Sequence, residues 1–268
     1  MSFLLRLQRN PVVNTLVKRL AIHRLADWLL GIRPLRRTTP TGLKYQISST
    51  ASLVAAKEIF DTGMYSEPLA GQAIRRFVDL GCNVGYVPIL LADLAGHRDL
   101  EGIAIDGNQT VIDETRAHVK ANGLSKVAVI LGLAGFDDSQ TEADFHINPS
   151  SHIASTATGK LNPDVPSAGR SVKVTVPCIN VEAAWAQRFG DARIDLLKVD
   201  IEGMELELFR NSPALLARSD RLLFEWHKWQ VTIADCTAIL TAAGFESPRT
   251  IWEDAQHGLA FCERGKRG

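Results

Sequence analysis

Short β-rich runs alternate with helical stretches from residue 75 to the end of the 268-residue chain, and this alternation restricts the fold more than any other feature. Strands are expected at 76–80, 100–106, 126–134, 171–179, 193–201, 221–227 and 258–264, and helices at 86–96, 109–123, 181–189, 204–217 and 232–245. Strands that alternate with helices imply an α/β fold with a doubly wound, mostly parallel sheet that is covered on both faces.

The first 44 residues differ from the rest of the chain in charge. They contain nine lysines and arginines and one acid, Asp27, for a net charge of +8, so the remainder of this formally neutral chain carries −8. Residues 12–30 place apolar side chains at helical spacing with basic ones between them. This predicted helix either packs on the main domain or contacts an anionic membrane surface, a lipid-linked substrate or a partner. We therefore expect a basic helical extension at 1–50 and one domain at 51–268.

The composition also bears on where the protein works. The sequence has no run of about 18 apolar residues, so no transmembrane helix is expected. Basic residues are scattered through the first 20 positions, unlike the pattern of a secretory signal. The four cysteines lie far apart without a C-x-x-C pair, which argues against a disulfide framework or a zinc site. We expect a cytoplasmic protein, with peripheral contact at the inner membrane surface as the open alternative.

The segment FVDLGCNVGY, residues 77–86, runs from a strand through a sharp turn into a helix. In an open parallel sheet, ligands bind beyond the carboxyl ends of the strands, where this turn lies. Gly81 and Gly85, with Asn83 between them, let the backbone approach a ligand closely, while Asp79 would repel a pyrophosphate. The spacing departs from the G-x-G-x-x-G of dinucleotide folds. It favours S-adenosylmethionine, a cation without phosphate, whose amino-acid end Asp79 would hold directly or through water.

The second predicted strand also ends in an acid. Asp106 is placed to accept hydrogen bonds from both ribose hydroxyls, and Gly107 and Asn108 turn the chain beside the adenosine. Leu133 and Ala134, after the third strand, are expected to pass close to the adenine. Two other interpretations stay open, namely a dinucleotide site and a glycine-rich turn that binds nothing.

The ends of two later strands carry candidate catalytic residues. Lys198, Asp200 and Glu202 share one side of an extended run, and His227 ends the strand at 221–227. Methylation of an alcohol requires a base within hydrogen-bond reach, and histidine titrates near neutrality. We expect His227 to be the base, Asp200 to orient it or the substrate, and Glu202 to be the third catalytic residue. The alternatives are a structural ion pair between Glu202 and Lys198 and a packing role for His227.

Residues around His227 leave further interpretations open. A divalent metal held by Asp200, Glu225 and His227 would acidify a hydroxyl, but these ligands are scattered over two strands and no metal is assigned. Trp226 and Trp229 suit either stacking on a sugar ring or packing in the core, and core packing is expected for at least one of them.

The block IDLLKVDIEGMELELF, residues 194–209, is the most specific stretch of the chain. Together with DLGCNVGY (79–86), NGL (122–124) and LLFEWH (222–227), it resembles the FkbM-type methyltransferase family over roughly residues 52–262. The resemblance implies a class I, Rossmann-like fold and S-adenosylmethionine as cofactor. It also implies methyl transfer to hydroxyls of sugars or natural products, although amide nitrogens are targets of some relatives.

Two positions depart from the family pattern. Asp106-Gly107 stands where a glutamate followed by proline is more common, a chemically mild change. Ile179-Asn180-Val181 replaces a threonine-leucine-aspartate cap, which puts the role of that loop in doubt.

The polar stretch 137–170 is too long for a simple connection and is expected to be functional or mobile. Its segment 148–160 is a candidate lid over the acceptor, with His146 and His152 nearby. Nucleic acid is not expected as a partner, because the main domain is acidic and the basic segment lacks interleaved aromatics. We predict O-methylation of a hydroxyl on a saccharide or related polar metabolite. N-methylation of an amide or amine and a non-catalytic cofactor-binding module are the alternatives.

Overall fold

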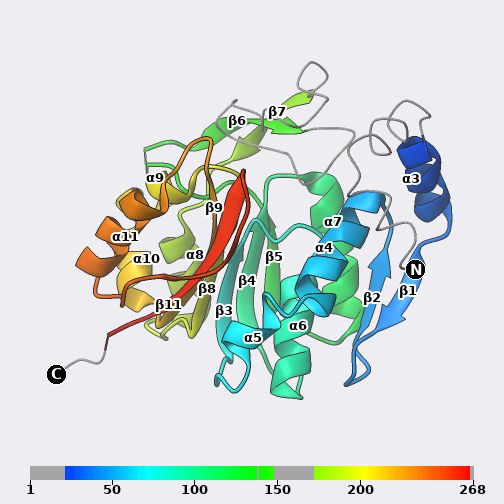
Figure 1. Ribbon diagram of the computed structural model, residues 1–268, viewed down its shortest axis with the longest axis horizontal. Coiled ribbons are helices and arrows are strands. Elements are labelled where there is room, and N and C mark those ends of the chain that lie inside the picture. The colour runs from blue at the N-terminus through cyan, green and yellow to red at the C-terminus, as the bar shows by residue number, and fades with distance from the viewer. Residues whose placement is uncertain (1–21, 138, 148–171, 266–268) are drawn as a thin grey trace.

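Helices and strands alternate along the part of the chain that the computed structural model describes, residues 22–137, 139–147 and 172–265 (Figure 1). The helices are α3 (Ile22–Ile32), α4 (Thr50–Ala56), the π-helix η1 (Lys57–Asp61), α5 (Ser66–Leu69), α6 (Tyr86–Ala95), α7 (Gln109–Ala121), α8 (Val181–Phe189), α9 (Glu205–Asn211), α10 (Pro213–Arg218) and α11 (Ile233–Ala242). The strands are β1 (Leu35–Thr38), β2 (Lys44–Ile47), β3 (Arg76–Leu80), β4 (Glu101–Asp106), β5 (Val127–Leu131), β6 (Glu142–Ile147), β7 (Val172–Pro177), β8 (Leu196–Val199), β9 (Arg221–His227), β10 (Arg249–Glu253) and β11 (His257–Glu263).

The large sheet has seven strands in the spatial order β10-β11-β9-β8-β3-β4-β5. Neighbouring strands from β9 to β5 run parallel, whereas β11 pairs antiparallel with both β9 and β10. The chain leaves β3 toward β4 and β5 on one side and returns to β8 on the other, so the strand order reverses between β3 and β8. This reversal is the switch point at which Rossmann-like sheets bind their ligands. The predicted doubly wound, mostly parallel α/β fold is confirmed.

Apolar residues of the sheet are buried on both faces, as Figure 1 suggests from the helices on either side. Along β3, Phe77 belongs to the core beneath α4, α6 and α7, while Val78 and Leu80 belong to the core beneath α8 to α11. A parallel sheet needs such two-sided cover, because successive side chains of each strand point to opposite faces. The same alternation places Asp79 and Lys198, which are partners in the β3–β8 register, on the face beneath α6.

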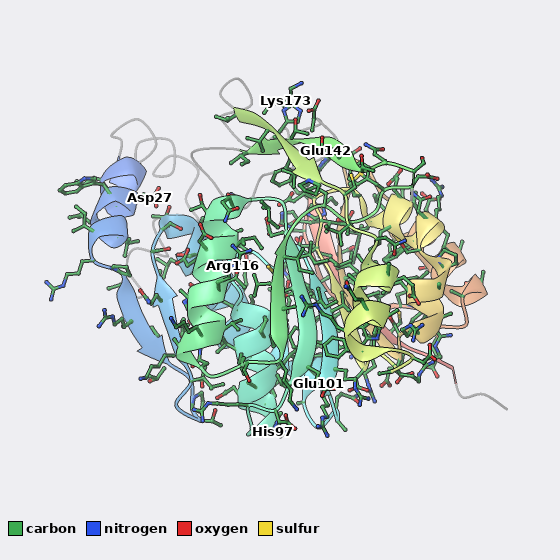
Figure 2. All side chains as sticks on the ribbon, turned by 180° about the vertical axis from the view of Figure 1, so that it is seen from behind. Asp27, His97, Glu101, Arg116, Glu142 and Lys173 are labelled. Carbon is green, nitrogen blue, oxygen red and sulfur yellow. The ribbon has the colours of Figure 1, made fainter. Side chains whose placement is uncertain are left out.

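A small two-stranded sheet, β6 and β7, lies above the carboxyl end of β5 (Figure 2, where Glu142 and Lys173 are labelled). Leu133 forms a bridge to Cys178 just beyond β7 and packs with Phe145 of β6 and Val176 of β7. The predicted strand at 171–179 is therefore a strand, but it belongs to this separate sheet. The whole of the predicted lid, 148–160 with His152, lies outside the described residues.

Within the segment expected to be a helical extension, residues 35–38 and 44–47 instead form the antiparallel hairpin of β1 and β2. Leu43 and Ile47 are buried in the main core. The Asn122 side chain, at the end of α7, accepts a hydrogen bond from the Lys44 amide (2.6 Å) and donates one to its carbonyl (2.7 Å). The sequence did not indicate this hairpin, because its strands are short and polar.

Other elements differ in detail from the prediction. The single helix expected at 204–217 is divided into α9 and α10, because Pro213 lacks the amide needed to continue a helix and instead begins α10. Strand β10 was not predicted. Of the predicted helix at 12–30, only residues from 22 onward are described, and these are helical. Among the described helices, none is long and apolar enough to cross a membrane.

Candidate active site

A pocket opens beyond the carboxyl ends of β3, β4, β5 and β8, at the switch point of the sheet. It is lined by Leu80, Gly81, Asn83, Ile105, Asp106, Gly107, Gly132, Leu133, Ala134, Phe145, Asp200, Ile201, Glu202 and Met204. Five of the predicted cofactor residues, Gly81, Asn83, Asp106, Gly107 and Ala134, thus lie together. We call this the cofactor pocket.

The turn after β3 requires its glycines for different reasons. Gly81 has a φ of +70°, and a Cβ there would lie 1.7 Å from the backbone oxygen of Asp200, so no side chain fits between the ends of β3 and β8. Gly85 has a φ of +78°, and a Cβ there would lie 2.7 Å from Cγ2 of Thr115 on α7. Gly85 does not line the cofactor pocket. A glycine is therefore needed at position 85 because the backbone there packs closely against α7, and not because it approaches a ligand in the pocket.

Asp106 is held by backbone amides on both carboxylate oxygens. Oδ2 accepts a hydrogen bond from the Asn83 amide (3.0 Å), and Oδ1 accepts one from the Asn108 amide (2.9 Å). Burial raises the pKa of Asp106 to about 6, although both hydrogen bonds oppose this shift. The Asn108 side chain accepts from the Thr110 amide and so caps α7. Asn108 therefore shapes the pocket from behind and is not part of its lining.

Asp79 is fully buried and pairs with Lys198, whose Nζ lies 3.2 Å from Asp79 Oδ1. Lys198 Nζ also donates to the Gly81 carbonyl (2.7 Å) and lies 3.5 Å from Asp200 Oδ2. Burial raises the pKa of Asp79, and the charge of Lys198 opposes this. Asp79 lines neither the cofactor pocket nor the cavity beside it. Its carboxylate would therefore act on a ligand only through Lys198, which lines that neighbouring cavity.

A second cavity, of about 310 Å³, adjoins the cofactor pocket. The two share Gly81, Asn83, Asp200 and Glu202, which form a common wall. The second cavity is further lined by Val54, Ala55, Glu58, Ile59, Tyr65, Cys82, Val84, Tyr86, Val87, Lys198, Glu225, His227, Trp229 and His257. Because it meets the cofactor pocket along this wall, we call it the acceptor cavity.

His227 lies on the floor of the acceptor cavity, almost fully buried. Its Nδ1 lies 2.9 Å from Oε1 of Glu205, which also accepts from the amides of Ile201 (3.2 Å) and Gly203 (3.1 Å). An oxygen that accepts from two amides is an acceptor toward the ring as well, so Nδ1 carries the proton that is donated to Glu205. His227 Nε2 then faces Glu202 Oε2 at 3.4 Å and Asp200 Oδ1 at 3.8 Å.

The pKa of His227 reflects these neighbours. Burial by itself would lower it, but the carboxylates of Glu205 and Glu202 outweigh burial and hold the pKa well above the ordinary 6.5. Burial has the opposite effect on the carboxyls, whose pKa values it raises. Burial raises the pKa of Glu202 to about 8 despite the charge of His227, and burial together with Asp200 raises that of Glu225 well above its ordinary value.

The same cluster contains a set of possible metal ligands. One ligand atom each from Asp200, Glu225 and His227 lie within 4.8 Å of one another. Carboxylate oxygens and an imidazole nitrogen bind divalent ions, and a buried carboxylate on the far ring nitrogen, here Glu205, is a frequent companion of such a histidine. The geometry is therefore compatible with either a base or a metal ligand at His227.

The structure brings the three predicted catalytic residues, His227, Asp200 and Glu202, together. Lys198 does not pair with Glu202, as one alternative had it, because it is held between Asp79 and Asp200. The residue that orients His227 within hydrogen-bond distance is Glu205, which the sequence interpretation missed.

The signals for the missed residues were present but incomplete. Glu205 is one of the acids of the block 194–209, and its four-residue spacing from Ile201 was the available clue. Trp226 is 1% exposed and packs in the core, whereas Trp229 lines the acceptor cavity. Glu58 and Tyr65 also line this cavity, although they come from segments before β3 whose approach to it no local pattern indicates.

The strand order, the glycine turn after β3 and the acid that ends β4 together define a class I, S-adenosylmethionine-dependent methyltransferase. Residues 79–247, more than half of the chain, match the methyltransferase FkbM domain. The chain belongs to this family, and the resemblance noted in the sequence is confirmed.

Several solved structures of methyltransferases are similar in fold. The human methyltransferase 10 domain containing protein is 14% identical, with 91% of this chain and 95% of that chain covered and a TM-score of 0.48. M. capricolum TrmK in complex with S-adenosyl-homocysteine is 11% identical over 78% of this chain and 70% of that chain, with a TM-score of 0.46. A SAM dependent methyltransferase from Aquifex aeolicus is 12% identical over 79% and 93%, with a TM-score of 0.45. Likenesses this distant say nothing about the substrate of this chain. A comparison with curated protein sequences finds no match.

Proposed function

We propose that this methyltransferase transfers methyl from S-adenosylmethionine to a hydroxyl of a saccharide or a related polar metabolite. The observation that carries the proposal is the common wall of the two cavities, at which His227 presents Nε2 while Glu205 fixes Nδ1. A methyl donor in the cofactor pocket and a hydroxyl in the acceptor cavity would meet beside a base where the two cavities adjoin.

The cofactor pocket fits the proposed donor. A Cβ at Gly107 would lie 2.5 Å from Cδ2 of Leu133 and 3.0 Å from the ring of Phe145, so no side chain fits where the chain after β4 passes these residues of the pocket lining. Asp106 has further acceptor capacity for a ribose diol, and Ala134 lies where an adenine would rest. Asp79 would act at the amino-acid end by holding Lys198 against the Gly81 carbonyl.

His227 would take the proton of the acceptor hydroxyl on Nε2. The donor supplies, when bound, an activated methyl carbon on a positively charged sulfur, and this charge opposes protonation of a nearby imidazole. As the acceptor oxygen forms its bond to the methyl carbon, the carbon–sulfur bond breaks, its electron pair stays on sulfur, and the hydroxyl proton moves to His227. Asp200, which faces Nε2, would stabilise the imidazolium, and Asp200 and Glu202 together would orient the hydroxyl.

The same site supports proposals for the domain organisation and for the class of substrate. We propose that residues 51–268 are the catalytic domain and residues 1–50 an extension, whose hairpin is fastened to that domain. The substrate is a small molecule or glycan and not nucleic acid, since carboxylates dominate the acceptor cavity. N-methylation of an amine or amide is the second candidate, because the same carboxylates suit a cationic group.

The experiment compares the wild-type chain with His227→Gln and, as a matched control, His257→Gln, which alters another histidine of the cavity. Each is incubated with labelled S-adenosylmethionine and a polar metabolite extract, and binding of S-adenosylhomocysteine is measured by calorimetry. We expect His227→Gln to bind the product normally and to lose transfer by about 10²–10⁴-fold. His257→Gln should lose less than about tenfold, because His257 does not contact Glu205. Undiminished transfer by His227→Gln would refute the assignment of the base, and the absence of product binding would refute the cofactor pocket.

A further inference from the structure

Helix α3 exposes an apolar stripe to solvent. Leu25, Trp28, Leu29 and Ile32 are 57%, 61%, 52% and 65% exposed, respectively. Their spacing of three and four residues places them on one side of the helix, over about two turns. Single exposed apolar residues are ordinary, but a contiguous stripe on a helix marks an interaction surface.

The stripe faces outward because the opposite side of α3 is fastened to the protein. Asp27 Oδ1 accepts hydrogen bonds from the amide (2.7 Å) and the hydroxyl (2.8 Å) of Thr50, at the start of α4. At about 100° per residue, Asp27 lies roughly opposite the centre of the stripe. Figure 2 labels Asp27 between α3 and the rest of the molecule. The amphipathic helix is thus turned with its polar contact inward and its apolar side outward.

Basic residues follow the stripe directly. Arg33 and Arg36 are exposed, and Leu35 between them is 40% exposed and extends the apolar surface. Asp27 is the only acid among residues 1–57, and its carboxylate is engaged by Thr50. Figure 1 shows α3 and β1 together at one edge of the molecule, away from the large sheet. The apolar stripe and the arginines beside it therefore form one continuous surface, which is apolar along α3 and positively charged next to it.

We infer that this surface docks on an anionic lipid bilayer. A stripe of leucine, isoleucine and tryptophan is suited to the boundary between headgroups and acyl chains, where tryptophan is favoured. Arg33 and Arg36 complement anionic headgroups, which a purely apolar protein interface would not require. The inference is independent of the reaction proposed above.

Helix α3, which carries the docking surface, is connected to the acceptor cavity through α4. Thr50 begins α4, and Val54 and Ala55 of the same helix line the cavity. Because α4 spans the distance between α3 and the cavity, docking would hold the cavity near the bilayer surface. A surface of this kind is suited to an acceptor that is itself attached to lipid.

The test is cosedimentation of the full chain with vesicles. Vesicles of phosphatidylglycerol and phosphatidylcholine are compared with vesicles of phosphatidylcholine alone, at low and high salt. We expect binding to the anionic vesicles only, weakened by salt. The double variant Trp28→Ser/Leu29→Ser should weaken binding at least about tenfold, and Arg33→Gln/Arg36→Gln about thirtyfold.

Leu94→Ser is the matched control, since Leu94 on α6 is a 40% exposed leucine outside the stripe. It should leave vesicle binding unchanged. Circular dichroism and binding of S-adenosylhomocysteine verify that each variant is folded. The inference is overturned if the wild-type chain does not bind anionic vesicles, if Trp28→Ser/Leu29→Ser binds them as well as Leu94→Ser does, or if sedimentation velocity shows that the stripe instead joins two copies of the chain.

Discussion

Replacing Glu205 with glutamine isolates the electrostatic role of the carboxylate behind His227. Glu205 is fully buried, and its Oε1 accepts all three hydrogen bonds, from His227 and from the amides of Ile201 and Gly203. Its Oε2 has no hydrogen-bond partner among the residues that the structure describes. A glutamine with its oxygen at the Oε1 position can therefore keep the three bonds and remove the charge, while its NH2 group takes the position of Oε2. The turn that carries Glu202 stays in place.

The expected magnitude follows from the change in that one interaction. A hydrogen bond to a charged group contributes about 1.5–3 kcal/mol and a neutral one about 0.5–1.5 kcal/mol, so the imidazolium loses roughly 1–1.5 kcal/mol. At 1.36 kcal/mol for each pH unit, the pKa of His227 falls by about one pH unit. A base needs its unprotonated form, so the rising limb of the pH–rate profile moves about one pH unit lower. The weaker base should also lower the plateau kcat by about three- to tenfold, well short of the loss expected for His227→Gln.

The assay is the pH dependence of methyl transfer by wild type, Glu205→Gln and Glu207→Gln. Glu207 lies two residues further along α9 and undergoes the same chemical change, so it controls for the loss of one negative charge on this helix. We expect its profile to match wild type. A Glu205→Gln profile that keeps the wild-type limb while kcat falls would refute the reasoning, since Glu205 would then act only by holding the turn.

Four further predictions follow from the same structure. Asp106→Asn should weaken S-adenosylhomocysteine binding by about 10–100-fold in calorimetry, because it keeps one strong acceptor for two amides and loses the charge. Gly81→Ala should unfold the chain or lower its stability by more than about 3 kcal/mol in denaturant titration, whereas Gly96→Ala, which has positive φ and nothing within 4 Å of the added Cβ, should cost only about 1 kcal/mol. The melting temperature should fall as pH rises from about 4.5 toward 8, because Glu202, with a pKa raised to about 8, is protonated when folded and ionised when unfolded; Glu202→Gln should flatten this slope. Chelation with EDTA should leave transfer unchanged, and a loss restored by Mg²⁺ or Mn²⁺ would make His227 a metal ligand and not the base.

The sheet could be predicted from the sequence because its strands are buried on both faces. Short runs such as 76–80 and 196–199 are mostly apolar, which distinguishes them from surface loops. The hairpin of β1 and β2 could not, because Leu43 and Ile47 are its only fully buried apolar side chains, and one of these lies in the turn. Its stability comes from hydrogen bonds to α7, which are contacts between distant parts of the chain.

The residues of the candidate site also divide into those that the sequence could predict and those that it could not. Asp106 and His227 end strands, and the carboxyl ends of neighbouring parallel strands meet at one edge, so their proximity follows from the order of elements. Glu58 comes from a π-helix before β3, and nothing in its neighbourhood indicates that it would turn toward the acceptor cavity. Asp79 was placed on the correct strand end, but its burial against Lys198 depends on the register of β3 with β8.

The balance of charge in the acceptor cavity restricts the chemical classes of acceptor that fit there. Lys198 is already compensated by Asp79 and Asp200, so it offers little net charge to a ligand. Burial raises the pKa of Glu58 to about 7, and neighbouring carboxylates add to the shift, as they do at Glu225. Since these acids already oppose one another's ionisation, a phosphate or carboxylate on the acceptor would add a further charge of the same sign. A neutral or amine-bearing polyol meets no such penalty, which supports a saccharide acceptor over a nucleic acid.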